Sequence, residues 1–542
     1  MRQFVLSRRI NLLTIALIVL AVVLRLIPGP RTIDDAFITF RYARNIVHGV
    51  GFIYNAGERV LGTTTPLYTL WMATLALISG SENFPLFALV TNALADAAST
   101  YLLYHLGRRL SNSSLVGWAI ALLWAVSPMS VTFAIGGMET SVFILLMLAT
   151  FAAHLERRPY LTAVLAALSL LTRPDAGLII VLVFAQLLWE NLRSRSLNPV
   201  SPPSTLHPPL ATLYAPRSTL YVAGLWILVF ALVIAPWAIF ATAYFGNPLS
   251  QSMFAKSIAY RLEPEEGLVR LLQHFSVPFF ESDVFDLGGL IRLVVYLALY
   301  LIAALAAFRR EPRSLPFFAY PLLYAAAFAI ANPLIFRWYL APPTPAYMLG
   351  ILLGASHILA RLVSVRNPRS ATPALRAGAS VRNLIFGTVV AIYMVLSLVA
   401  WTLHPDHGPD RPAPQMAYIQ LELFYHQVAA DLKPHVRPDT VIAAGDIGAL
   451  GYDTNARILD TLGLISPQTL RHYPLDPSLY VIPYAMSPQL ILDQQPDWLV
   501  APEVYLRRGV LLNTQFQAQY QLLETIPTDI YGSHGLLVFR RK

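Results

Sequence analysis

TIDDAFITFRYARNIVHGVGFIYNAGERVLGTTTP, residues 32–66, follows directly on the first long apolar run of the chain. At about 3.6 residues per turn, 33–48 forms a helix with one apolar face and one polar face. The polar face carries Asp34 and Arg41, and a second acid, Asp35, stands next to the first. An amphipathic helix at this place is typical of a segment that lies in the membrane interface. The sequence therefore raises the question of what two adjacent carboxylates do there.

The composition around this stretch is that of a membrane protein. Of the 542 residues, 56% are hydrophobic and 13% are charged, whereas soluble domains carry about 25% charged residues. Apolar runs of about 20 residues, the length that crosses a bilayer, recur along the chain. The net charge of +9 comes from arginines in short loops between these runs, which indicates the positive-inside pattern rather than nucleic-acid binding. Because the chain has no cysteine, disulfides and thiolate metal sites are excluded.

The basic loops predict the topology. The basic N-terminus precedes an apolar run without a small-residue cleavage site, so we interpret that run as a retained helix that starts in the cytoplasm. All later arginine-rich loops lie inside if the apolar segment 66–80 lies along the outer surface instead of crossing. The predicted crossings are then 10–27, 85–106, 114–133, 139–154, 160–173, 175–190, 219–243, 287–308, 314–331, 338–360 and 383–402. We therefore expect about eleven transmembrane helices, with the C-terminus outside.

The expected fold class is a mainly α, polytopic membrane protein with a small α/β domain outside the membrane. Residues 1–403 form the transmembrane part, with a first external loop at 28–84 and a Pro- and Ser-rich cytoplasmic loop at 191–218. From 404 to 542 the composition is that of a soluble domain. There DTVIAAGDIGALGY, DWLVAP and HGLLVFRRK are typical of strands, and QMAYIQLELFYHQVAADL is typical of a helix.

The two acids differ in what their neighbours explain. Thr32 and Asp35 have the spacing of a capping box, so Asp35 is predicted to satisfy backbone N–H groups at the helix start. Asp34 has no such structural reason and shares a face with Arg41. Asp34 is therefore the better candidate for chemistry.

The Gly- and Thr-rich end of the stretch predicts the start of another helix. Pro66 suits the first helical position and Thr65 suits the N-cap. A helix N-terminus flanked by hydroxyl groups can hold a phosphate or a polyol, although capping alone also explains such a sequence.

From Asp34 to this turn, the sequence resembles the first external loop of the GT-C-type membrane glycosyltransferases. It is most similar to the mycobacterial terminal arabinofuranosyltransferases, whereas the protein O-mannosyltransferases and the lipid A aminoarabinose transferases are more distant. The stretches that agree with this resemblance are GGMETSVF (136–143), LTRPDAG (171–177), GNPLSQSMFAKS (246–257), FRWYLAP (336–342), GDIGALGY (445–452) and RILDTLGL (457–464).

The resemblance implies a transferase that takes its sugar from a polyprenyl-phosphate donor at the outer face of the cell membrane. A glycan, lipid or protein accepts the sugar, and the configuration at the sugar carbon inverts. A first-loop aspartate, here Asp34 with Asp35 beside it, is the implied base, and a divalent metal ion at Asp34 is allowed by analogy. The protein then mainly has to deprotonate the acceptor and neutralise the departing phosphate.

The implied ligands of the donor phosphate and the substrate are Arg41, Thr64, Glu139, Arg173, Lys256 and Arg337. Several have a simpler alternative. Lys256, one of three lysines in an arginine-rich chain, is otherwise a lysine at the lipid surface. Glu139 also suits the dipole of the helix it begins, and Arg173 can simply pair with Asp175. Arg337 either binds the phosphate or anchors the interface together with its aromatic neighbours.

Other function classes stay open. A transporter or lipid-sugar flippase would also hold charges in its membrane part, but transporters favour internal repeats and broken helices near the midplane. Here the polar residues gather at the external boundary. A catalytically inactive envelope-assembly protein is a third interpretation. In the C-terminal domain, Asp446 and Asp460 are interpreted as turn residues at strand ends.

Overall fold

The structure is a computed structural model, and it describes residues 11–197, 218–280, 285–365, 373–403, 412–414 and 419–542. Each predicted crossing coincides for most of its length with a helix, although 338–360 begins before α17 and 383–402 ends in the strand β1 (Trp401–Leu403). The long helices of the bundle are α1 (Leu12–Leu26), α4 (Phe84–Ser111), α5 (Ser114–Val126), α6 (Pro128–Ile135), α7 (Thr140–Leu155), α8 (Pro159–Thr172), α9 (Gly177–Leu197), α11 (Ser218–Phe245), α14 (Leu287–Arg310), α15 (Leu315–Ala331), α17 (Thr344–Val365) and α18 (Pro373–Val399).

The expected number of crossings is not confirmed. Among the described residues, α4, α11, α14, α15 and α17 are long and apolar enough to cross a membrane, and the pair α5–α6 adds a sixth span if it counts as one. The other helices predicted to cross, such as α1, α7 and α8, are apolar but shorter. The structure thus supports a multi-pass membrane protein with five or six full-length spans.

The break between α5 and α6 is a bend of 50°. Pro128 begins α6, and the residue before it is held in an extended conformation, as the proline ring requires. Arg25 of α1 satisfies the backbone near this break: its guanidinium donates to the Ala125 carbonyl at 2.5 Å and to Asp96 Oδ2 of α4 at 3.0 Å. A buried ion pair therefore ties α1 and α4 to the bent span.

Shorter helices connect the bundle to the site. They are α2 (Asp34–Val47), α3 (Pro66–Ser79), α12 (Gln251–Ala259), α13 (Glu266–Ser276) and α16 (Arg337–Leu340). The predicted interface helix 33–48 agrees with α2 to within a residue at each end. The 14 residues of α3 are fewer than the about 20 that a crossing needs. As expected, Thr65 is the N-cap residue and Pro66 begins the helix, although the Thr65 side chain makes no capping bond.

A five-stranded sheet forms the C-terminal part. Its strands are β3 (Val441–Ala444), β4 (Arg457–Asp460), β5 (Trp498–Pro502), β6 (Tyr520–Ile526) and β7 (Leu536–Arg541), in the order β4-β3-β5-β7-β6. β3 runs parallel to both of its neighbours, and β7 runs antiparallel to both of its own. The helices here are α19 (Ile419–Leu432), α20 (Gly448–Thr454), α21 (Pro488–Gln494), α22 (Glu503–Leu506) and α23 (Thr514–Gln519), and the short strands β1 (Trp401–Leu403) and β2 (Pro412–Pro414) form a separate ladder beyond α18.

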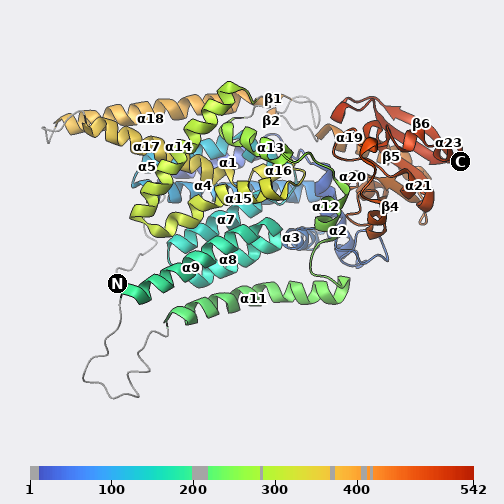
Figure 1. Cartoon of the computed structure of the whole chain (residues 1–542), viewed down its shortest axis with the longest axis horizontal. Coiled ribbons are helices and arrows are strands. Elements are labelled where there is room, and N and C mark those ends of the chain that lie inside the picture. The colour runs from blue at the N-terminus through green and yellow to red at the C-terminus, as the bar shows by residue number, and fades with distance from the viewer. Residues whose placement is uncertain (1–10, 198–217, 281–284, 366–372, 404–411, 415–418) are drawn as a thin grey trace, which may run out of the picture.

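The sheet lies at one end of the bundle, next to α2 and α12 (Figure 1). The opposite end of the bundle holds the starts of α5 and α18 and the end of α9. One continuous apolar core joins residues of α2 and α3 to the sheet. The segment 28–84 and the C-terminal sheet are therefore packed together, and Asp34 and Arg41 of α2 lie where the two meet.

Candidate functional site

The docking of α2 on α20 decides the role of Asp34. Its two carboxylate oxygens accept the backbone N–H groups of Gly448 and Ala449, both at 2.8 Å. These are the first N–H groups of α20, where a negative charge is favoured by the helix dipole. Asp34 is therefore a capping residue, although it caps a helix more than 400 residues away.

Arg41 completes the same contact from the other end. It lies two turns after Asp34 on α2, and it donates to the carbonyls of Gly451 and Ala456 at 2.8 and 2.7 Å. Two helical turns span about 10 Å, which matches the length of the seven-residue α20. The acid thus meets the positive end of α20 and the guanidinium meets its carbonyl end. The prediction of a shared polar face is confirmed, but these contacts use Arg41 for docking and not for a phosphate.

Two glycines of α20 make this approach possible. A Cβ atom at Gly448 would lie 1.7 Å from the Asp34 carbonyl oxygen, and one at Gly451 would lie 2.0 Å from the Tyr54 hydroxyl and 2.6 Å from Arg41. The backbone of α20 therefore touches α2 and its loop directly. The sequence GDIGALGY, which the resemblance singled out, is the part of the C-terminal domain that fits against the first loop.

The expected capping box is wrong. The N-cap of α2 is Ile33 and no side chain caps it. Thr32 instead donates to Glu422 of α19 at 2.5 Å. Asp35 has no hydrogen-bond partner among the described residues, and its side chain is partly exposed. Local spacing predicted that Asp35 binds backbone N–H groups and that Asp34 does not. The structure shows the reverse, because N–H groups of the distant C-terminal domain bind Asp34 and not Asp35.

Charges around Asp35 come from α12 and the C-terminal domain. Burial raises the pKa of Asp35, and the positive charge of Lys256 opposes this rise. Burial also lowers the pKa of Lys256, but the Tyr339 hydroxyl and the Asp35 carboxylate outweigh it and keep the pKa above its ordinary value. Lys256 is thus a charged partner of Asp35, which argues against its alternative as an isolated lysine at the lipid surface.

The turn at 61–62, between α2 and α3, also positions Lys256. The Ser250 hydroxyl and the backbone N–H of Gln251, at the start of α12, both donate to the Leu61 carbonyl, at 3.1 and 2.8 Å. Ser252 donates to the Gly62 carbonyl. Because the turn at 61–62 anchors α12 in this way, α2 and α12 belong to one rigid corner, and Lys256 is held near Asp35.

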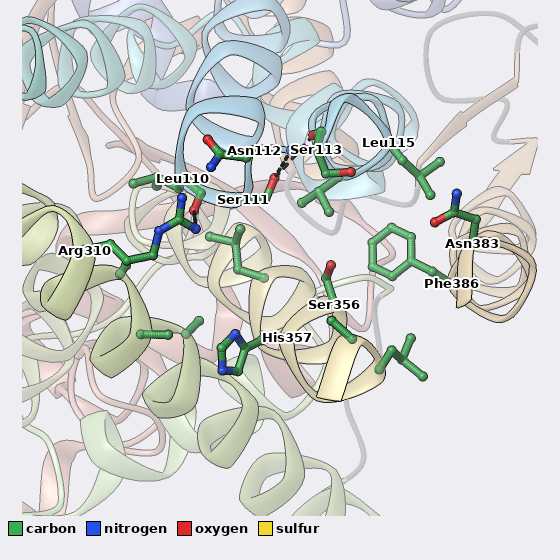
Figure 2. Close-up of a pocket in the computed structure, with 17 residues that line it drawn as sticks. Leu110, Ser111, Asn112, Ser113, Leu115, Arg310, Ser356, His357, Asn383 and Phe386 are labelled. Carbon is green, nitrogen blue, oxygen red and sulfur yellow. Dashed lines mark hydrogen bonds between the residues drawn. The ribbon is translucent and has the colours of Figure 1, made fainter. Parts of the chain in front are cut away.

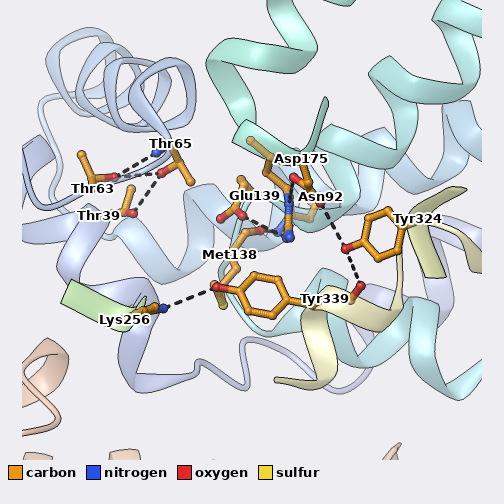
Figure 3. A network of polar contacts seen from close by, with 11 residues as sticks. Thr39, Thr63, Thr65, Asn92, Met138, Glu139, Asp175, Lys256, Tyr324 and Tyr339 are labelled. Carbon is orange, nitrogen blue, oxygen red and sulfur yellow. Dashed lines mark hydrogen bonds and ion pairs between the residues drawn. The ribbon is translucent and has the colours of Figure 1, made fainter. Parts of the chain in front are cut away.

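A polar network continues from Lys256 into the bundle (Figure 3). Lys256 Nζ donates to the Tyr339 hydroxyl at 3.4 Å, and the Tyr339 ring lies between Lys256 and the Arg173 guanidinium, which is 5.2 Å from the ring centroid. The Tyr324 hydroxyl contacts the Tyr339 carbonyl at 2.6 Å and Asp175 at 3.2 Å. The aromatic side chains therefore connect the two cations.

Arg173 is paired with two acids. Its guanidinium lies 3.0 Å from Asp175 and 3.4 Å from Glu139, and both Arg173 and Glu139 are buried. Asn92 of α4 donates to the carbonyl of Met138 at 2.8 Å and so fixes the residue before Glu139. The proline after Arg173 starts the short turn between α8 and α9, which lies where the predicted crossings 160–173 and 175–190 meet. Arg173 therefore pairs with Asp175 and also belongs to the cluster around Lys256.

Two other predicted ligands lie outside these contacts. Thr64 is half-buried and has no hydrogen-bond partner among the described residues, whereas the neighbouring Thr63 and Thr65 hydroxyls contact each other at 3.1 Å (Figure 3). Arg337 begins α16, where its charge, together with burial and Arg270, lowers the pKa of His274 to about 3.

Sequence reasoning missed two residues near Asp35. Asp460 is the turn residue that was expected, since it is buried and accepts the N–H groups of Leu462 and Ile465. Asp446 instead interacts with the charge of Asp35: burial raises its pKa, the hydroxyls of two tyrosines lower it, and the charge of Asp35 raises it further. Tyr260, directly after α12, interacts with both acids, because burial and then the charges of Asp35 and Asp446 raise its pKa. The position of Asp446 directly after a parallel strand is the sequence signal that could have found it.

The structure gives no support to a metal at Asp34. Among the described residues no group of three or more acidic or histidine side chains has an arrangement that could hold a metal ion. Both oxygens of Asp34 are already used by backbone N–H groups.

A cavity of about 300 Å³ lies elsewhere, where α4 ends and α5 begins (Figure 2). Polar side chains on its wall include Arg310 and His357. The start of α4 stacks on α2 through Phe84 and Phe40, and the 28 residues of α4 span about 40 Å. The cavity is therefore separated from Asp35 by the length of α4 and holds none of the predicted site residues.

Comparison with known proteins finds one family model and several solved structures. Residues 414–539 match a family model described as a domain of unknown function (DUF8728). A search of curated protein sequences gives no match.

Among solved structures, the chain is similar to the oligosaccharyltransferase AglB from Archaeoglobus fulgidus, solved with an inhibitory peptide and a dolichol-phosphate. The TM-score is 0.56 at 12% identity over 90% of this chain and 69% of that one. ArnT from Cupriavidus metallidurans bound to undecaprenyl phosphate gives 0.46 at 13% identity over 97% of both chains. The arabinofuranosyltransferase AftD from Mycobacteria gives 0.42 at 14% identity over 98% of this chain and 42% of that one. At these identities, the likeness to AglB establishes the fold alone.

Proposed function

We propose that this chain, which has the fold of the GT-C membrane glycosyltransferases, transfers a sugar from a polyprenyl-phosphate donor to an acceptor hydroxyl, with Asp35 as the base. The supporting observation is the difference between the adjacent acids. Asp34 is used by two N–H groups of α20, whereas Asp35 is partly exposed, has no described hydrogen-bond partner and interacts with Lys256. A carboxylate with a raised pKa next to a cation is suited to general-base catalysis.

The proposed reaction is a single displacement. Asp35 accepts the proton of the acceptor hydroxyl while the acceptor oxygen attacks the anomeric carbon of the donor sugar. The bond from that carbon to the phosphate oxygen breaks, and its electron pair leaves with the polyprenyl phosphate. Attack opposite to the leaving group inverts the configuration of the sugar carbon.

Lys256 is the proposed partner of the departing phosphate. An ammonium group has three donor hydrogens, and one of them is directed at the Tyr339 hydroxyl. Arg173 is already neutralised by Asp175 and Glu139, so its proposed role is to hold Tyr339 from the other side. Charge-assisted hydrogen bonds stabilise a phosphate best when they are preorganised in this way.

A panel of labelled polyprenyl-phosphate pentoses and hexoses, offered to the full chain in lipid nanodiscs with candidate glycan, lipid and protein acceptors, tests this function. We expect release of polyprenyl phosphate together with a labelled product of inverted linkage, and loss of both in Asp35→Asn. If no donor is cleaved, while the same lipid-linked sugar crosses the bilayer of proteoliposomes, the chain is a flippase and the proposal is wrong.

A further inference from the structure

The carboxyl edge of the C-terminal sheet faces the proposed site. β3 lies between β4 and β5 and runs parallel to both, so the chain leaves β3 toward one side and returns on the other. In open α/β sheets, ligands bind beyond the carboxyl ends of the strands at such a point. Gly445 and Asp446 are the first residues beyond β3, and Asp446 interacts with the charge of Asp35.

Hydrogen bonds orient the Asp446 carboxylate but use only one of its two oxygens. Its Oδ2 accepts the hydroxyls of Tyr425 at 3.1 Å and Tyr505 at 3.3 Å. Its Oδ1 has no hydrogen-bond partner among the described residues, and the side chain is partly exposed. The two tyrosines therefore fix the direction of the carboxylate and leave one oxygen for a ligand.

A series of packed aromatic rings connects the end of α12 to Tyr505, which binds Asp446. The Tyr260 ring lies 6.2 Å from Phe336 and 6.1 Å from Tyr484, and the Tyr484 ring lies 4.9 Å from Tyr505. These rings run from α12 and the segment before α16 to the C-terminal domain. Aromatic side chains offer an apolar surface with a polar tip, and sugar rings present the same combination of C–H faces and hydroxyl groups.

The signs of the charges separate two sides of the site. The cations Lys256 and Arg173 lie on the bundle side, where the donor phosphate is proposed to bind. Asp446 contributes a carboxyl group on the sheet side, which carries a negative charge above its pKa, raised by burial to about 7. An anionic acceptor placed there would oppose a carboxylate with another acceptor group, which disfavours it. Hydroxyl groups can instead donate to a carboxylate oxygen.

We propose that Asp446, oriented by Tyr425 and Tyr505, binds a second hydroxyl of the acceptor, and that the acceptor is therefore a neutral carbohydrate chain. This inference rests on the proposed transferase function and names the substrate class of the same site. Asp35 then deprotonates the attacking hydroxyl while Asp446 selects and orients the sugar that carries it. Asp446 is a specificity-determining residue supplied by the C-terminal domain.

Binding of oligosaccharides to the full chain in nanodiscs, without donor, tests the inference. The probes are neutral gluco-, manno-, galacto- and arabino-oligosaccharides, each beside a matched oligosaccharide in which one sugar is a uronic acid. We expect the wild-type chain to bind a neutral member and to discriminate against its anionic match. Asp446→Asn should weaken that binding by about tenfold to a hundredfold, as expected for a hydrogen bond to a charged group, and Tyr505→Phe should weaken it less.

Asp497→Asn is the matched control, because Asp497 lies in the same domain and its exposed carboxylate pairs with Arg541. It should bind like the wild-type chain. In transfer assays, Asp446→Asn should raise the KM for the acceptor and leave donor-lipid binding unchanged, which a merely structural role would not do. Tm values of the variants identify any that fail to fold, and Tyr505→Phe retains the test in that case.

Three results would overturn the inference: preferred binding of the anionic oligosaccharides, unchanged neutral binding in Asp446→Asn, or no binding of any oligosaccharide. Transfer to a non-sugar acceptor without oligosaccharide binding would reject this inference but keep the proposed function. Oligosaccharide binding that depends on Asp446, in a chain that cleaves no donor, would reject the transferase function but keep the binding role.

Discussion

The two faces of α2 differ in how completely their polar groups are used. On the face toward α20, Asp34 and Arg41 each make two hydrogen bonds to the ends of a buried helix. On the face toward α12, Asp35 has no described hydrogen-bond partner and interacts with Lys256 through charge. Adjacent residues of a helix point about 100° apart, so neighbours in sequence can serve different tasks. The face with Asp34 and Arg41 holds the C-terminal domain in place, and the face with Asp35 is left for a substrate.

The largest expected effect is that of Asp35→Asn, which tests whether the two faces of α2 have different roles. Asp35→Asn should lower kcat by about 10²- to 10⁴-fold, the usual contribution of a general base, and should leave the Tm unchanged because Asp35 holds nothing in place. Asp34→Asn should instead lower the stability by about 1–3 kcal/mol, since one N–H of α20 loses its acceptor. Single-turnover transfer and thermal unfolding of both variants provide the measurements. A stable but inactive Asp34→Asn beside an active Asp35→Asn would reverse the assignment.

Lys256→Ala tests the face of α2 that carries Asp35. It should weaken donor-lipid binding by about tenfold to a hundredfold, the loss of one charge-assisted hydrogen bond. The positive charge of Lys256 lowers the pKa of Asp35, so its removal raises that pKa. Because the base must be ionised, the acidic limb of the pH–rate profile should move to higher pH.

Lys256→Arg keeps the charge and is the control for this shift. Donor-binding titrations and kcat/KM across pH measure the two effects separately. An acidic limb that stays in place in Lys256→Ala would separate Lys256 from Asp35.

Gly451→Ala tests the face of α2 that contacts α20. The added Cβ would meet the Tyr54 hydroxyl and Arg41, and overpacking of this kind costs about 1–3 kcal/mol. Hydrogen exchange at 448–454 should increase. Gly224→Ala, also within a helix, has no atom within 4 Å of the new Cβ and should leave exchange there unchanged. Equal exchange in both variants would show that α20 does not need close contact with α2.

The smallest expected effect concerns His426, which packs against Phe37 of α2 with ring centroids 4.8 Å apart. Although burial lowers its pKa, the hydrogen bonds that His426 donates to Asp453 and Glu422 raise it to about 10. This contribution to stability is complete below the unfolded pKa of about 6.5 and is lost as the pH rises through 10. The Tm difference between the wild-type chain and His426→Gln should therefore shrink between these pH values, and a constant difference would contradict the ion pair.

The sequence predicted α2, its polar face and the proline-started helix after it, because these depend on local periodicity and caps. It also named Lys256, Arg173 and Glu139, which the fold brings into one network. The sequence predicted the capping role for Asp35 instead of Asp34, because the groups that bind Asp34 lie 414 and 415 residues away. The strands β4 and β6 were missed, since β4 has four residues and β6 is exposed along most of its length, so neither shows a clear alternation. The position of Asp446 at the end of β3 can be found in the sequence, but its interaction with Asp35 cannot, because that depends on which edge of the sheet meets α2.

The ion pair between Arg25 and Asp96 sets an order of events during synthesis. An arginine in an apolar helix is costly in lipid until it finds a partner, and Asp96 is made 71 residues later. At about 5–20 residues per second, α1 waits several seconds with an unmatched charge before α4 exists, and longer before the Ala125 carbonyl follows. We therefore expect α1 to reach its final position in the bundle only after α4 and the bent α5–α6 span have been made.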